Sequence, residues 1–518
     1  MKKLTVLCSI LCLVSLVSFS QNQEQQKVID NMIQGAVVNS QLEILAHQLM
    51  DVIGPRLVGT PQMKEAGDWI VETYQGWGIS AKTEQWGTWK AWERGVTHID
   101  MLSPRLETLT GMQLAWNPST GSKGVTAETI VMPKVIDSLQ FANWLPNVKG
   151  KFVLLSMKQP TGRPDDNWKA FATEASYKKM KDERNDQVSG WYANFRRAGY
   201  NSRSIVSVFE NAGAAGIIDS YWSKGFGVNR IFNAKTKSIP HVDLELEDYT
   251  MLYRLTESGN IPKLKIVAES KDLGIAPAFN TLGEIRGSEK PEEYVILSAH
   301  LDTWDGATGA TDNGTGTIVM MEAMRLLKKF YPNPKRTILV GHWDSEEQGL
   351  NGSSAFVEDH PEIVNNIQAL FNQDDGTGRV VNISGAGFLH SYKYLTRWLA
   401  AVPNDITQHI KTEFPGSPKS SGSDNVSFLA AGAPAFDLSA LGWSYHDYTW
   451  HTNRDTYDKI VFDDVRSNAI LTAILVYMAS EDPDKTPTEK IVLPINPRTG
   501  KQEKWPKPRT PNRKGNQN

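Results

Sequence analysis

The stretch from residue 294 to residue 375 constrains the fold of this chain most. Three short apolar segments in it, YVILSAH, RTILVGHW and ALFNQ, are each about as long as one buried strand. Each segment runs directly into residue types that bind metal ions. The side chains in question are His300, Glu346, Glu347, Asp374 and Asp375.

Two helical patterns separate these strands, TGTIVMMEAMRLLKKF and the weaker SSAFVEDHPEIV. The order strand, helix, strand, helix, strand predicts an α/β fold with a mostly parallel central sheet flanked by helices. Ligands of such sheets bind beyond the carboxyl ends of the strands, where all of these side chains are expected. The loop TGATDNGTG follows the first strand and places Asp312 near His300.

Length and charge limit the classes of function. A chain of 518 residues exceeds what one hydrophobic core usually supports, so we expect at least two domains. The net charge of -3, with both signs interspersed, predicts no nucleic-acid partner. The oligomeric state is left open.

The first twenty residues have the pattern of a signal peptide. Lys2 and Lys3 precede an apolar run that ends at Val17, and Ser18-Phe19-Ser20 resembles a signal-peptidase site. We therefore expect an exported protein, periplasmic or secreted, that begins near Gln21 and keeps no stable membrane anchor. Both cysteines lie in the apolar run, so the metal ligands must be His, Asp and Glu.

The rest of the chain divides into segments that differ in residue composition and pattern. The loop PSTGSKG near Asn117 opens a different kind of sequence that lasts to about Ser270 and appears as an insert in one catalytic domain. A charged, aromatic excursion within it, residues 165–201, is either a solvated helical face or a cover over the active site. The predicted units are 1–20 (signal peptide), 21–117 and 271–485 (two parts of the catalytic domain), 118–270 (insert) and 486–518 (basic, proline-containing, mostly disordered tail).

The candidate ligands make chemical sense together. A hydrolytic site with two zinc ions needs two His, a shared carboxylate, a terminal carboxylate per ion and a free carboxylate as base. The chain offers His300, His451, Asp312, Glu347, Asp374 and Glu346. A single His or Glu pair is usually structural or solvated, and His342, His390 and His446 are assigned to that class. Asp302, two residues after His300, is expected to orient that imidazole.

These motifs resemble those of the co-catalytic zinc exopeptidases, the family of aminopeptidase Y and the glutamate carboxypeptidases. The chain is most similar to plasma glutamate carboxypeptidase-like members, whose protease-associated domain the insert resembles. The resemblance rests on SAHLDTWD, ATDNGTG, SEEQGLNGS, NQDDGTG, SGSDN and HTNRDTYD. It implies one zinc ion at His300, Asp312 and Asp374, a second at Asp312, Glu347 and His451, and Glu346 as general base. Asp375 departs from the family pattern and is a competing candidate ligand or substrate contact.

We therefore expect an aminopeptidase or dipeptidase that cleaves a peptide or dipeptide near a free terminus. Tyr445 or Tyr448 would stabilise the oxyanion, and Asp375 or Asp424 would recognise the terminal charge. Two alternatives remain. One is a glutaminyl cyclase-like acyltransferase with a single metal ion, and the other is a receptor-like relative that binds none.

Overall fold

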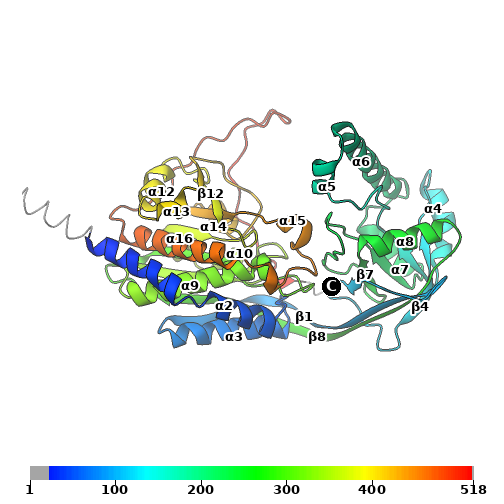
Figure 1. Cartoon of the computed structure of the whole chain (residues 1–518), viewed down its shortest axis with the longest axis horizontal. Helices are drawn as coiled ribbons and strands as arrows, with labels where there is room; N and C mark the ends of the chain where they lie inside the picture. The colour runs from blue at the N-terminus through cyan, green and yellow to red at the C-terminus, as the bar shows by residue number, and fades with distance from the viewer. Residues whose placement is uncertain (1–22, 516–518) are drawn as a thin grey trace, which may run out of the picture.

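The computed structural model describes residues 23–515 (Figure 1). The predicted signal peptide, residues 1–20, lies outside this range. Within it, no helix is both long and apolar enough to cross a membrane.

A central group of parallel strands carries the site. Strand β9 lies between β10 and β11, and β11 is followed by β14, with every one of these pairs parallel. Antiparallel β8 flanks β10. Every residue of β10 and of β11 is buried, as expected for strands covered on both faces. The bounds are β8 Lys263–Ile285, β9 Lys290–His300, β10 Arg336–Trp343, β11 Ile367–Asn372 and β14 Ala435–Ala440.

Helices cover both faces of this sheet (Figure 1). Two consecutive residues of β10 contact helices on opposite faces of the sheet, because neighbouring side chains of a strand point in opposite directions. His342 contacts Tyr74 of α3, whereas Trp343 packs on Phe356 of α10 and Phe428 of α14. Helix α16 packs on α9 and β9. The bounds are α3 Pro61–Gly76, α9 Thr315–Phe330, α10 Asn351–Asp359, α14 Asn425–Ala431 and α16 Phe462–Glu481.

Two long antiparallel strands, β1 and β8, connect this half of the molecule to the other (Figure 1). The second half has its own buried apolar clusters and includes β4 to β7 with α4 to α8. The division at residues 118 and 270 stays a prediction, since β8 runs through residue 270 without a break. The bounds are β1 Ser80–Ser103, β4 Val125–Val131, β5 Lys151–Leu154, β6 Gly216–Asp219, β7 His241–Leu244, α4 Ser138–Trp144, α7 Ser204–Asn211 and α8 Leu246–Glu257.

The charged excursion of the second half is helical. It forms α5 (Asp165–Phe171) and α6 (Glu174–Arg197). Helix α6 buries only Met180, Asn194 and Phe195. This arrangement agrees with the interpretation as a largely solvated helical face.

The C-terminal segment differs from the expected disorder up to residue 515, the last described. Trp505 donates a hydrogen bond to the Leu429 carbonyl (2.9 Å), and its ring packs on Phe388. Arg513 pairs with Asp359, and β15 (Lys514–Gly515) joins β1 as a parallel strand. Composition predicted disorder because few residues here are apolar, but these specific contacts hold the segment against the half that contains the central parallel strands.

Candidate metal centre

The predicted site residues lie at the carboxyl edge of the parallel strands. His300 is the last residue of β9, and Asp374 follows β11 by two residues. Glu346 and Glu347 follow β10, and Asp312 lies in η3 (Ala310–Gly314), immediately before α9. His451 arrives from the loop after α15 (Tyr445–Tyr448). The strand order therefore gathers side chains that are up to 151 positions apart in the sequence.

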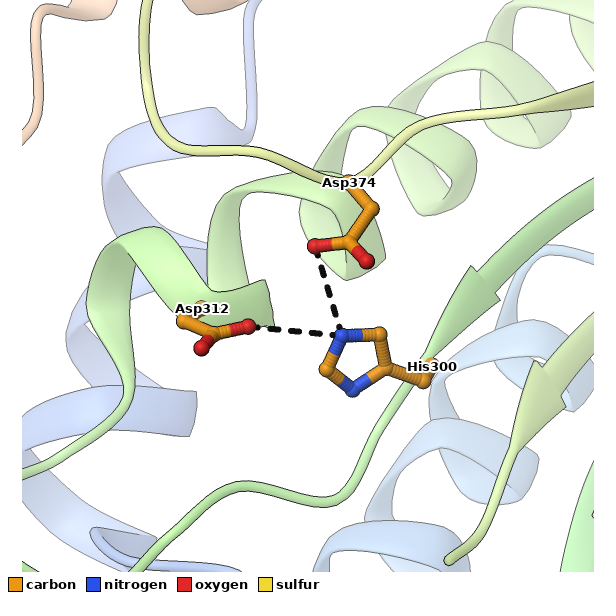
Figure 2. A group of neighbouring side chains, drawn as sticks. All are labelled: His300, Asp312 and Asp374. Atoms are coloured by element: carbon orange, nitrogen blue, oxygen red, sulfur yellow. Dashed lines mark ion pairs between the residues drawn. The ribbon is translucent and has the colours of Figure 1, made fainter. Parts of the chain in front are cut away.

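Two groups of potential metal ligands adjoin and share Asp312. In the first, His300 Nε2 lies 3.5 Å from Asp312 Oδ1 and 3.4 Å from Asp374 Oδ1 (Figure 2). In the second, His451 Nε2 lies 3.3 Å from Asp312 Oδ2 and 2.9 Å from Glu347 Oε2. The two oxygens of Asp312 thus face different histidines, as a carboxylate shared between two ions requires.

The donor set fits divalent cations. His300 Nε2, Asp312 Oδ2 and Glu347 Oε1 are buried and have no hydrogen-bond partner within the described part of the chain. Buried polar atoms are normally paired, so atoms left over in a cluster indicate a missing partner. Nitrogen and carboxylate oxygen are the donors that zinc takes in proteins. The groups that the sequence proposed as ligands are therefore suitable for a pair of zinc ions.

Shifted pKa values show the same excess of negative charge. Burial raises the pKa of Glu346 and of Glu347 well above the usual range, and neighbouring carboxylates add to the effect. Burial alone would lower the pKa of His300, but Asp374 and Glu346 together raise it well above its ordinary value. His451 behaves differently, because burial lowers its pKa to about 4. Bound cations would relieve this crowding of carboxylates.

Asp302 forms hydrogen bonds with His300 and with the backbone of the two glutamates. Its carboxylate accepts hydrogen bonds from the backbone N–H groups of Glu346 (3.0 Å) and Glu347 (3.3 Å). His300 Nδ1 lies 2.9 Å from the backbone carbonyl of Asp302 and 3.7 Å from its carboxylate. The expected contact with the imidazole thus runs through the carbonyl, while the fully buried carboxylate fixes the turn that carries the two glutamates.

Of the neighbours Asp374 and Asp375, only Asp374 joins the ligand groups. Asp375 has a φ of +83°, in the left-handed region, and its backbone N–H donates to Asp374 Oδ1 (2.7 Å). This turn leaves the Asp375 side chain exposed. Although part of its surface is open to solvent, the protein atoms packed around Asp375 desolvate its carboxylate, and together with the charge of Asp374 they raise its pKa to about 7.

The remaining candidates occupy different surroundings. Asp424 is fully buried close to Glu346, and burial raises its pKa to about 7. Tyr445 is also buried, and burial followed by the charges of Asp312 and Asp374 raises the pKa of its hydroxyl well above the usual range. Tyr448 instead lies against Gly225 of the other half. Both tyrosines line a cavity of about 440 Å³.

Two residues that sequence reasoning did not assign also support the centre. Arg56 is fully buried and donates to the backbone carbonyls of Leu301, Thr308 and Gly309, so it holds the loop between His300 and Asp312. Asp455 accepts hydrogen bonds from the backbone N–H groups of Thr311 (2.7 Å) and Asp312 (3.0 Å). Arg56 lies in GPRLVGT, which reads as an ordinary turn, whereas Asp455 belongs to the HTNRD motif and could have been noticed there.

Known proteins with related sequences and folds were compared with the chain. Residues 280–476 match the family model of Peptidase family M28. Carboxypeptidase Q of Bos taurus is 26% identical over 457 residues, which cover 88% of each chain. The Peptidase M28 precursor of Shewanella amazonensis SB2B has a TM-score of 0.66 at 24% identity, covering 90% of this chain and 99% of that one. BSAP, a zinc aminopeptidase from Bacillus subtilis, has a TM-score of 0.55 at 19% identity, covering 87% and 97%.

These comparisons test the predictions at different levels. The two structural matches confirm the predicted fold, a mostly parallel central sheet flanked by helices. The family match and the relative confirm the predicted resemblance and the class of enzyme, a metallo-exopeptidase. The insert's likeness to a protease-associated domain stays a prediction.

Proposed function

We propose that the chain, whose residues 280–476 match Peptidase family M28, is an exported exopeptidase with two zinc ions, an aminopeptidase or dipeptidase that hydrolyses peptide bonds near a free terminus. One observation carries this proposal. Two ligand groups share Asp312, and the half-buried Glu346 lies beside them, next to the ligand Glu347 in the chain. Export rests on the signal pattern of residues 1–20.

The residues divide the work as follows. Zinc ions held by His300, Asp312 and Asp374 and by Asp312, Glu347 and His451 would supply Lewis acidity, which acidifies water and polarises a carbonyl group. The Glu346 carboxylate accepts a proton from the attacking water as the water oxygen bonds to the peptide carbonyl carbon. It then delivers that proton to the nitrogen of the leaving amine as the C–N bond breaks. A pKa raised by burial suits a group that must both take up and return a proton.

Tyr445 is the preferred donor to the developing oxyanion. Burial raises the pKa of its hydroxyl well above the usual range, and the charges of Asp312, Asp374 and Glu347 add to the effect. Because that hydroxyl stays protonated at neutral pH, it can donate a hydrogen bond to the carbonyl oxygen. The Tyr448 ring packs against Gly225 of the other half, so we assign Tyr448 to the cavity wall.

Recognition of a free terminus is assigned to Asp375. Its carboxylate is exposed at the rim of the ligand groups, where it can pair with the ammonium group of a substrate. Asp424 is too deeply buried for that role, and its charge instead contributes to the raised pKa of Glu346. Peptides with a free amino terminus should therefore be cleaved in preference to N-acetylated ones. Equal cleavage of both would favour a carboxypeptidase.

Two substitutions test the central assignment. Glu346→Gln removes the base but keeps the side-chain shape, so zinc content should stay at two per chain while turnover falls by roughly 10²- to 10⁴-fold. Glu347→Gln should instead weaken one zinc site and recover partly when zinc is added. If Glu346→Gln lost metal and Glu347→Gln kept both ions, the two roles would have to be exchanged. The zinc content of the unaltered protein also tests the alternatives, because a cyclase-like enzyme would hold one ion and a receptor-like protein none.

A further inference from the structure

We infer that residues 227–232 of the second half of the molecule form a clasp that positions His451. The inference rests on the proposed function, in which His451 is a ligand of the second zinc ion. It makes Asn229 a positioning residue of the metal centre, although Asn229 lies more than 200 positions before His451 and touches no ligand atom.

The clasp is a short two-stranded ladder between the halves of the molecule. Arg230 and Thr452 form an antiparallel bridge. The backbone N–H of Ile231 donates to the carbonyl of His451 itself (2.8 Å), and the N–H of Asn453 donates to the carbonyl of Asn229 (3.0 Å). The backbone from the carbonyl of His451 to the N–H of Asn453 is therefore bonded to the other half of the molecule.

Side chains anchor this ladder in the sheet of the second half. Asn229 is fully buried, and its backbone N–H and side-chain oxygen bond to the side chain of Asn453 (3.0 and 3.2 Å). Its Nδ2 donates to the carboxylate and carbonyl of Asp243 in β7 (both 3.2 Å). The Arg454 guanidinium donates to the carbonyl of Gly227 (2.7 and 3.0 Å). The His451 loop is thereby connected to a strand outside the parallel group that carries the other ligands.

The backbone of His451 needs such support. Its φ is +60°, in the left-handed region that a side chain other than that of glycine rarely adopts. Such a conformation persists only where the surroundings enforce it. Residues 227–232 also contact the imidazole, because the Phe232 ring packs edge-on against it with ring centres 5.2 Å apart. The clasp thus contacts both the backbone and the ring of His451.

The two zinc sites should depend on the clasp unequally. His300 ends a buried strand and Asp374 follows another, so the sheet itself places them. His451 lies on a loop outside any strand, and this loop is bonded to Asn229 and Ile231. Weakening the clasp should therefore loosen the site of Glu347 and His451 and spare that of His300 and Asp374.

Asn229→Ala tests this inference, with Asn194→Ala as the matched control. Asn194 is a buried asparagine of the same half, with hydrogen bonds of similar length to Pro133 and Val135, but it lies in α6. The Asp243 carboxylate keeps its bond from the Arg230 N–H (3.1 Å) in Asn229→Ala, so that variant should fold. Both zinc dissociation constants are measured on each full-length protein by competition with a chelator.

In Asn229→Ala we expect one dissociation constant to rise at least about tenfold, as for lost support of a metal ligand, with the other changed less than about twofold. Asn194→Ala should leave both within about twofold. Asn453→Ala removes the bonds between the Asn453 side chain and Asn229 and should have a similar effect. Added zinc should restore the turnover of both clasp variants, which a general loss of folding would not allow.

Two results would overturn the inference alone: an Asn229→Ala protein that matches Asn194→Ala, or one in which both zinc sites weaken equally. An unaltered protein that binds fewer than two zinc ions would overturn the proposed function and the inference together.

Discussion

Asp302→Asn should show that one buried carboxylate holds two glutamates of the centre in place. In the protein, this carboxylate accepts the backbone N–H groups of Glu346 (3.0 Å) and Glu347 (3.3 Å) and is fully buried. An amide has the same shape but keeps one acceptor oxygen, so one N–H group would face the NH₂ group of the new side chain. The protein would lose a hydrogen bond to a charged group and would keep a buried N–H group without an acceptor. We therefore expect the free energy of unfolding to fall by about 3 kcal/mol.

The same change should weaken metal binding. The turn that carries Glu346 and Glu347 would lose its fixed position, and zinc affinity should fall roughly 10- to 100-fold, as for other residues that orient ligands. Urea unfolding of the zinc-free protein measures the first effect. Competition with a chelator measures the second.

Asp305→Asn is the control, because Asp305 lies in the same loop but pairs with Arg94 (2.8 and 2.6 Å) instead of the two glutamates. It should also destabilise the protein, yet leave zinc affinity within about twofold. The reasoning is refuted if Asp302→Asn unfolds within about 0.5 kcal/mol of the unaltered protein and binds zinc equally well. It is also refuted if both variants weaken zinc binding to the same extent.

Three other properties can be measured. Burial lowers the pKa of His342 to about 3 from its ordinary 6.5, so the folded state excludes the protonated form of this side chain. The free energy of unfolding, measured by urea titration, should therefore fall by about 2 kcal/mol from pH 7 to pH 5. The fall should be smaller in His342→Gln. Arg56→Met leaves several buried carbonyls without donors, and the zinc-free protein should lose about 4 kcal/mol by urea unfolding, whereas an unchanged midpoint would contradict the role of Arg56. Trp505→Ala removes a half-buried ring from the catalytic half and should cost about 2 kcal/mol by thermal unfolding; no change would mean that the tail contributes nothing to stability.

The sequence alone predicted the parallel strands and the ligand types at their ends, because both depend on local order along the chain. One short apolar segment that ends on His300 was enough to predict a strand, its burial and the ligand at its end. Composition failed for residues 486–515 for a related reason. Their order depends on a few contacts with distant residues, such as that of Trp505 with Phe388, and average polarity carries no information about such contacts.

The family resemblance predicted which of these groups meet, but only the tertiary structure shows how their atoms pair. The two oxygens of Asp312 face His300 and His451, two histidines that the chain brings together across 151 positions. A left-handed turn at Asp375 separates two adjacent aspartates that the sequence leaves equivalent. The clasp around Asn229 likewise follows from the meeting of the two halves. Local patterns determine the elements and the kinds of side chain at their ends, whereas the pairing of atoms depends on how distant segments pack and on backbone angles that the packing enforces.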